Sequence, residues 1–174
     1  MSQETRSAPR ARFTLLEVMV ALLLMSGAFL AVAQLLAVAG RASDRSRATA
    51  LGAVLAAQKM EQLRALSWAF DIDGTTIDGL ILSPPGALSA DAAGFVDSFD
   101  GTGAPVGGGP PPPAQAAFVR RWSVEHGTGM APPAALILRV VVLYRGPPGA
   151  AVGPGAHGWT EVARVIGAKA RRPS

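Results

Sequence analysis

Cysteine is absent from the 174 residues, and aromatic residues make up only 6% of them. Without cysteine, the chain has no disulfide framework, no thiolate metal ligand and no cysteine nucleophile. Charged residues are also few, at 16%, and the formal net charge of +4 comes from scattered arginines rather than from a basic run. No basic patch is interleaved with aromatic residues, so the composition argues against a nucleic-acid partner.

The longest charge-free stretch lies near the N-terminus. From Val18 to Ala39 the sequence has no charged residue, and only Ser26 and Gln34 are distinctly polar. Roughly 22 residues at about 1.5 Å each are enough to cross the apolar layer of a membrane. Residues 1–12 form a short basic leader, which favours a cytoplasmic N-terminus. We therefore predict a transmembrane helix over residues 13–40.

The helical pattern continues beyond this apolar segment, because residues 41–70 contain no proline and are rich in alanine and leucine. Apolar positions recur there every three or four residues. They are Gly52, Ala56, Met60, Leu63 and Phe70, with Leu51 and Leu55 beside them. The charged residues fall mostly on other faces: Arg41, Asp44, Arg45, Arg47, Lys59 and Arg64. We predict one helix from about Phe13 to Leu66, roughly 80 Å long, whose amphipathic second half packs on a sheet.

The composition changes after residue 70. Residues 71–116 hold many acidic residues and glycines and a tetraproline, and we predict a loop region there. Residues 117–174 contain three strand candidates. They are Phe118–Glu125, which alternates like a half-buried strand, Leu136–Tyr144 and Trp159–Ala168. The expected fold class is α+β, with the long N-terminal helix packed on a small antiparallel sheet of about three strands.

One carboxylate, Glu17, interrupts the apolar run FTLLEVMVAL at residues 13–22. Such a group near the centre of a membrane helix costs about 2–3 kcal/mol, so it is kept where a partner or a function compensates. The run resembles the N-terminus of type IV pilins and type II secretion pseudopilins. Residues 56–63, AAQKMEQL, also resemble the end of the helix in minor pilins. This resemblance covers residues 13–66 and implies a pilin-like fold.

The resemblance also implies how the chain is processed and assembled. Prepilin peptidase would cut between Arg12 and Phe13, and the new amino terminus of Phe13 would be N-methylated. Glu17 would become the fifth residue and support assembly by pairing with the terminal amine of a neighbouring subunit. The family has glycine before the cut, where this chain has Arg12. In an uncleaved chain, Arg12 or Arg10 would take the place of the missing amine.

The function implied by the resemblance is that of a minor pilin or minor pseudopilin. This is a non-enzymatic structural subunit of a type IV pilus or of the pseudopilus of type II protein secretion, acting at the tip or in priming assembly. Its partners would be other pilin or pseudopilin subunits, prepilin peptidase and the inner-membrane assembly platform, and no cofactor is expected. The chain would cross the bacterial inner membrane once, with its C-terminal domain in the periplasm, and then enter the filament.

Two other fates of the N-terminal segment stay open. Ala31-Val32-Ala33 and Ala37-Val38-Ala39 supply the small-x-small pattern of signal peptidase sites. The segment would otherwise be an uncleaved anchor. Either alternative gives an exported or membrane-anchored β-rich binding domain outside any filament, in which Glu17 would be dispensable.

An aspartate motif follows the predicted helix. Asp71-Ile72-Asp73-Gly74-Thr75 reproduces the D-x-D-G-T signature of the haloacid dehalogenase phosphohydrolases. That chemistry needs the first aspartate at the end of a buried parallel strand, together with a downstream lysine and a carboxylate pair for the metal, and the sequence does not supply this context. We predict a polar turn instead. Asp71, Asp73 and Asp78 also lack EF-hand spacing, so they are only weak candidates for calcium and no metal site is expected.

Overall fold

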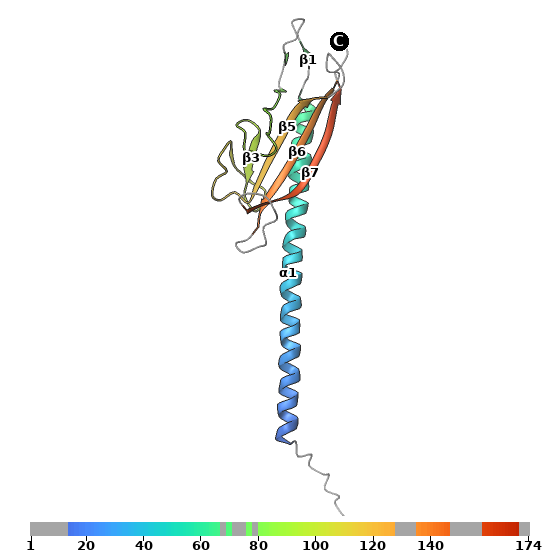
Figure 1. The fold of residues 1–174 in the computed structure, drawn as a ribbon, viewed down its shortest axis with the longest axis vertical. Coiled ribbons are helices and arrows are strands. Elements are labelled where there is room, and N and C mark those ends of the chain that lie inside the picture. The colour runs from blue at the N-terminus through green and yellow to red at the C-terminus, as the bar shows by residue number, and fades with distance from the viewer. Residues whose placement is uncertain are drawn as a thin grey trace, which may run out of the picture. The chain divides into compact units, whose positions relative to one another are not determined.

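The computed structural model describes residues 14–66, 69–70, 76–77, 80–127, 135–146 and 158–170. Its first element is α1 (Leu15–Ala65), a continuous helix of 51 residues, which confirms the helix predicted from about Phe13 to Leu66. Seven strands follow in the described part of the chain (Figure 1). They are β1 (Ala69–Phe70), β2 (Thr76–Ile77), β3 (Val96–Phe99), β4 (Pro105–Gly108), β5 (Phe118–His126), β6 (Ala135–Arg145) and β7 (Trp159–Ala170).

The helix contributes to two compact units, Met1–Asp44 and Arg45–Ser174. In the first unit, every residue of α1 is exposed. In the second unit, seven residues of α1 are buried, and they recur every three or four positions along one face. They are Ala48, Gly52, Leu55, Ala56, Lys59, Met60 and Leu63. The predicted amphipathic second half is confirmed, but Lys59, which we expected on another face, belongs to the buried face.

Five strands form one antiparallel sheet in the order β4-β3-β5-β6-β7, and β1 pairs antiparallel with β2 in a separate two-stranded sheet. This confirms the α+β class. The three longest strands, β5, β6 and β7, are the three predicted strands. The sheet gains two more, β3 and β4, from residues 71–116, where we expected a loop region. These short strands contain aspartate, serine and glycine instead of an apolar alternation, and β3 pairs with the distant β5 while β4 pairs with β3.

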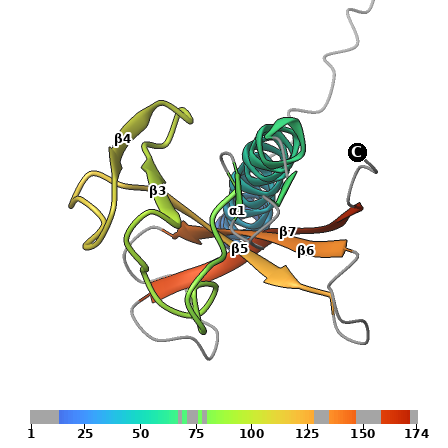
Figure 2. The same cartoon turned by 90° about the horizontal axis from the view of Figure 1, so that it is seen from above.

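The hydrophobic core of the second unit lies between α1 and one face of the sheet, and Figure 2 shows the helix on that face of β5, β6 and β7. Alternate residues of β5 and β6 point toward the helix, as the two-residue period of a strand requires. They are Phe118, Trp122, Val124, Leu136, Leu138, Val140 and Val142. Met60, predicted to be a core residue rather than a ligand, is 1% exposed.

The opposite face of β5 is covered by residues 80–95. Arg121 on this face donates from Nε to Asp91 at 2.9 Å. At the edge of β5, Ser83 pairs with the backbone of Val124, donating its N–H to the carbonyl at 3.0 Å and accepting the Val124 N–H on Oγ at 3.1 Å. Ser123, which the alternation placed on the polar side of a half-buried strand, is 1% exposed. The predicted alternation is present, but both faces of this strand are covered.

Two glycines allow α1 and β7 to approach each other closely. A Cβ atom on Gly52 would lie 2.6 Å from Val162 Cγ2, and one on Gly167 would lie 3.0 Å from Met60 Sδ. Near the end of the helix, Lys169 Nζ donates to the carbonyls of Arg64, at 2.7 Å, and Leu66. The last carbonyls of a helix have no partner within the helix, so this lysine of β7 caps α1 from the sheet.

The close contact at Gly52 gives a test of the helix–sheet packing. We expect Gly52→Leu to lower the free energy of unfolding by about 2 kcal/mol, because overpacking a filled interface forces side chains and backbone apart. The measurement is thermal and chemical denaturation of the full chain in detergent micelles. Ala53→Leu is the matched control, since Ala53 lies one position along α1 and is exposed. Equal stability of the two variants would contradict the close contact.

Candidate functional site

The first candidate site is the start of α1. Thr14 lies just before the helix, and its Oγ1 accepts a hydrogen bond from the Glu17 N–H at 3.3 Å. Thr14 therefore acts as the N-cap, and Thr14 and Glu17 have the T-x-x-E spacing of a capping box. The carboxylate of Glu17 also lies in the first helical turn, where the helix dipole favours negative charge. The sequence reasoning missed this local role, although the spacing is readable from the sequence.

An uncovered apolar surface follows this first turn. Between Leu15 and Val38, fifteen large apolar side chains are exposed, and they point to all sides of the helix. Covering each of these side chains contributes at least about 1.5 kcal/mol of transfer free energy, so exposing all of them to water costs on the order of 20 kcal/mol. Ser26, a polar residue within the segment, satisfies its hydroxyl by donating to the Leu23 carbonyl at 2.9 Å. The helix is a candidate membrane span by length and composition.

Glu17 is placed at the edge of this apolar surface. It lines a shallow depression on the helix together with Val18, Ala21, Leu22 and Met25. These positions are separated by one, four, five and eight residues from Glu17, so they share one face of the helix. A second helix lying against this face would bring its own side chains next to the carboxylate.

The other residues predicted to act in processing or metal binding lie outside the described residues. These are Arg12, Phe13, Asp71, Asp73 and Asp78. The described strand just before Asp71 is β1, a two-residue strand paired antiparallel with β2, and a phosphatase of the dehalogenase type would need a buried parallel strand there. Among the described residues, no group of three or more histidine or acidic side chains is arranged to hold a metal ion.

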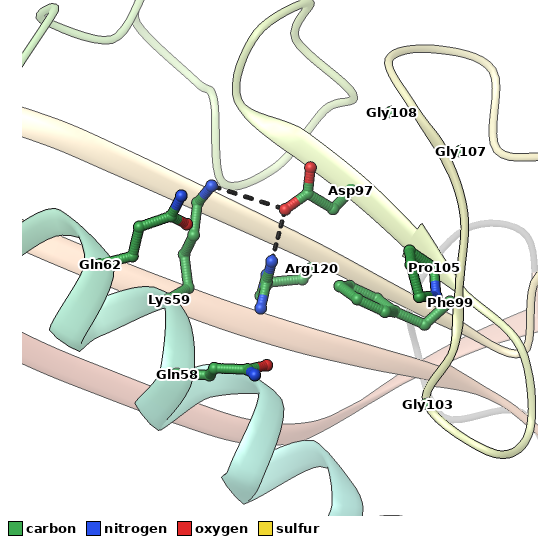
Figure 3. Close-up of a pocket in the computed structure, with 10 residues that line it drawn as sticks. All are labelled: Gln58, Lys59, Gln62, Asp97, Phe99, Gly103, Pro105, Gly107, Gly108 and Arg120. Carbon is green, nitrogen blue, oxygen red and sulfur yellow. Dashed lines mark hydrogen bonds and ion pairs between the residues drawn. The ribbon is translucent and has the colours of Figure 1, made fainter. Parts of the chain in front are cut away.

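The second candidate site is a polar cavity of about 660 Å³ between α1 and the β3–β4 hairpin (Figure 3). At its base, Asp97 of β3 accepts a hydrogen bond from Arg120 Nη2 at 2.6 Å and pairs with Lys59 Nζ at 3.5 Å. Lys59 and Arg120 are 8% and 7% exposed. Two nearly buried cations therefore share a single carboxylate.

Aromatic rings and a helix carbonyl complete the surroundings of the two cations. Lys59 Nζ lies 3.5 Å from the centre of a Trp122 ring, and the guanidinium carbon of Arg120 lies 4.6 Å from the Phe99 ring centre. Both distances fall within the range of cation–π attraction. Arg120 also donates from Nη1 to the Leu55 carbonyl at 2.9 Å. This arginine thus connects the sheet to the helix through one side chain.

Burial affects the pKa of Lys59. The loss of water around the ammonium group lowers the pKa of Lys59 below its ordinary value of 10.5; Asp97 opposes this effect and the neighbouring Arg120 adds to it. The sequence carries a signal for this site. Lys59 lies four positions after Leu55 and four before Leu63, on the apolar stripe, and a cation on such a stripe requires a buried partner.

Removing the shared carboxylate should destabilise the second unit. We expect Asp97→Asn to lower the free energy of unfolding by about 2 kcal/mol, because Lys59 and Arg120 would face each other without a counter-charge. The control is Glu61→Gln, which breaks the exposed Arg64–Glu61 pair and should change stability by less than about 0.5 kcal/mol. If both variants lost the same stability in denaturation of the full chain, the cluster would be no more than a surface pair.

The lowered pKa of Lys59 predicts an alkaline stability effect. Between its folded-state pKa and 10.5, the unfolded chain retains a proton that the folded chain has released. The stability contribution of Lys59 must therefore rise with pH through this window and level off above 10.5. The measurement is the difference in unfolding free energy between the wild type and Lys59→Met, from neutral pH upward. A difference that stays flat or falls over this range would contradict the burial argument.

Comparison with known proteins found no matching family model, no matching curated protein and no matching solved structure. Function is therefore inferred from the residues of this chain alone. They form two separate sets: the exposed apolar part of α1 with Glu17 in its first turn, and the polar cavity of the second unit.

Proposed function

We propose that this chain is a minor pilin or minor pseudopilin, a structural subunit of a type IV pilus or a type II secretion pseudopilus. The observation that carries the proposal is the apolar surface of α1, exposed on all sides and carrying one carboxylate in its first turn. Such a surface needs lipid or apolar helices around it. A pilin-like subunit meets lipid before assembly and the helices of its neighbours afterwards.

The position of Glu17 supports contact with another chain. In apolar surroundings an ionised carboxylate requires a cation, because desolvation is otherwise uncompensated. The next cation along the described chain is Arg41, 24 positions further, which corresponds to about 36 Å along a helix. We expect the counter-charge to come from residues 1–13 or from a second molecule. The terminal amine of a neighbouring subunit would supply it.

Processing between Arg12 and Phe13 would leave a terminal amine on Phe13 of every subunit. This amine would come directly before Thr14, close to the first turn of α1. The partners in this proposal are prepilin peptidase, the inner-membrane assembly platform and other pilin or pseudopilin subunits. The subunit would wait in the inner membrane with its C-terminal domain in the periplasm. The small sheet domain, Arg45–Ser174, would face outward in the filament and select partners at the tip or during priming.

The capping geometry at Thr14 favours a second candidate function. Glu17 could serve only to begin the helix, since its N–H and its first-turn position already stabilise that end. The chain would then be a membrane-anchored β-rich binding domain that enters no filament. The two candidates differ in whether the charge of Glu17 is needed outside its own helix.

Paired substitutions separate the charge from the cap. Glu17→Gln keeps a side chain suited to a capping box but removes the charge, and we expect its recovery with filaments to fall about tenfold, since an ion pair contributes about 1.4 kcal/mol or more. Thr14→Ala removes the cap but keeps the carboxylate, and it should be incorporated nearly normally. The measurement is co-isolation with filaments alongside the amount in membranes. Normal incorporation of Glu17→Gln would favour the anchored domain.

The N-terminal residue of the protein from its native membrane is the second test. We expect a start at Phe13 with a methylated amine, read from N-terminal analysis and intact mass. A start at Gln34 or Gly40 would indicate signal peptidase cleavage and would remove the apolar helix on which the proposal depends. A start at Met1 or Ser2 would favour the uncleaved anchor.

A further inference from the structure

The polar cavity of the second unit is lined mostly by charged, amide and glycine residues. Besides Lys59, Asp97 and Arg120, its walls are formed by two amide side chains of α1, Gln58 and Gln62, and by the β3–β4 hairpin. Figure 3 shows the side chains of Lys59 and Gln62 next to each other, with Asp97 facing them from the hairpin. The volume of about 660 Å³ lies within the range of ligand-binding cavities.

The charges in the cavity do not balance. Lys59 and Arg120, each more than nine-tenths buried, bring two positive charges, and Asp97 brings one negative charge. Arg120 Nε is also buried without a hydrogen-bond partner among the described residues. Burying a charge is costly unless it is paired, so one more anion would compensate the excess positive charge.

The other lining groups narrow the chemistry of this anion. Phe99 is the aromatic residue of the lining; it is 6% exposed and the Arg120 guanidinium lies over its ring, so it offers little surface for stacking a sugar or a base. The lining residues of α1 lie near its C-terminal end, where a helix offers no free N–H groups for a phosphate. A single carboxylate matches the single excess charge, and the amides of Gln58 and Gln62 can donate to its oxygens.

The shape of the cavity favours a side chain that remains attached to a partner. The cavity is open to the surface, whereas small-molecule sites usually enclose most of their ligand. Its hairpin wall contains Gly103, Gly107 and Gly108. A Cβ atom on Gly108 would lie 3.9 Å from Asp97 Oδ1, so Gly108 lies beside this carboxylate in the cavity wall.

We propose that this cavity binds the carboxylate of an aspartate or glutamate side chain presented by a partner protein. Lys59 and Arg120 supply the charge complement, and Gln58 and Gln62 contact the carboxylate at the opening. The inference stands apart from the proposed assembly role of Glu17, because every group involved belongs to the Arg45–Ser174 unit and the test uses small probes.

The test is a titration of the full chain in detergent micelles at constant ionic strength. The probes are a glutamate blocked at both ends, the matching blocked glutamine, succinate and inorganic phosphate. We expect the side-chain NMR signals of Lys59 and Arg120 to shift saturably with blocked glutamate, and the affinity for blocked glutamine to be at least tenfold weaker. Equal binding of the glutamine probe would overturn the proposal, as would succinate or phosphate binding ten times more tightly than blocked glutamate.

Two glycine variants locate the site. Gly108→Leu places a side chain over Asp97 without altering any charge and should abolish the shifts. Gly101→Leu is the matched control, since a Cβ there meets nothing within 4 Å and Gly101 does not line the cavity; it should bind normally. Retained binding in a folded Gly108→Leu protein would overturn the proposal.

A third variant decides the question if Gly108→Leu does not fold. Gln62→Glu would place a carboxylate at the opening of the cavity from α1, and it should reduce the affinity for blocked glutamate at least fivefold by occupying the same cations. Gln62→Asn, its uncharged control, should keep the affinity within about twofold. Unchanged binding by Gln62→Glu would overturn the proposal.

Discussion

The close packing of the second half of α1 on the sheet is the constraint on which the rest of the domain depends. A helix can approach a strand as closely as α1 approaches β7 only where one of the two lacks a side chain, and Gly52 and Gly167 provide this on the two partners. The approach brings Leu55, Met60 and their neighbours into the core beneath β5 and β6. It also brings the end of the helix within reach of Lys169, so that β7 satisfies carbonyls that the helix itself cannot.

The polar cluster around Asp97 depends on the same packing. Lys59 reaches Asp97 only because its helical face is turned toward the sheet, and Arg120 reaches Leu55 for the same reason. Through these contacts a short hairpin with little apolar surface of its own is held beside the helix. Its turn is stabilised separately, since Asp100 accepts hydrogen bonds from Thr102 and Ala104. The same contacts leave one positive charge in excess, which distinguishes this cluster from an ordinary balanced ion pair.

The two units meet opposite physical requirements. The helix up to Asp44 has no buried residue and exposes apolar side chains on every side, so its stability in place depends on what surrounds it. The Arg45–Ser174 unit has its own core, formed by α1 and the sheet. The proposed function rests on this contrast between a segment that needs apolar surroundings and a domain that has a core of its own. Glu17 is the residue at which local helix capping and contact with another molecule can both act.

The sequence by itself determined the elements whose signals are local. The long helix follows from the absence of proline and the three- to four-residue period, and β5, β6 and β7 follow from their apolar and β-branched runs. Glu17 stands out in the sequence because it is a single carboxylate in an apolar run, and its role outside its own helix belongs to the proposal. Only the tertiary structure decided the place of β3 and β4, the burial of Lys59 and the cavity, because Asp97 and Arg120 lie far from Lys59 in sequence. Period and composition report how a residue relates to its near neighbours, whereas the partner of a buried charge is fixed by how distant segments pack.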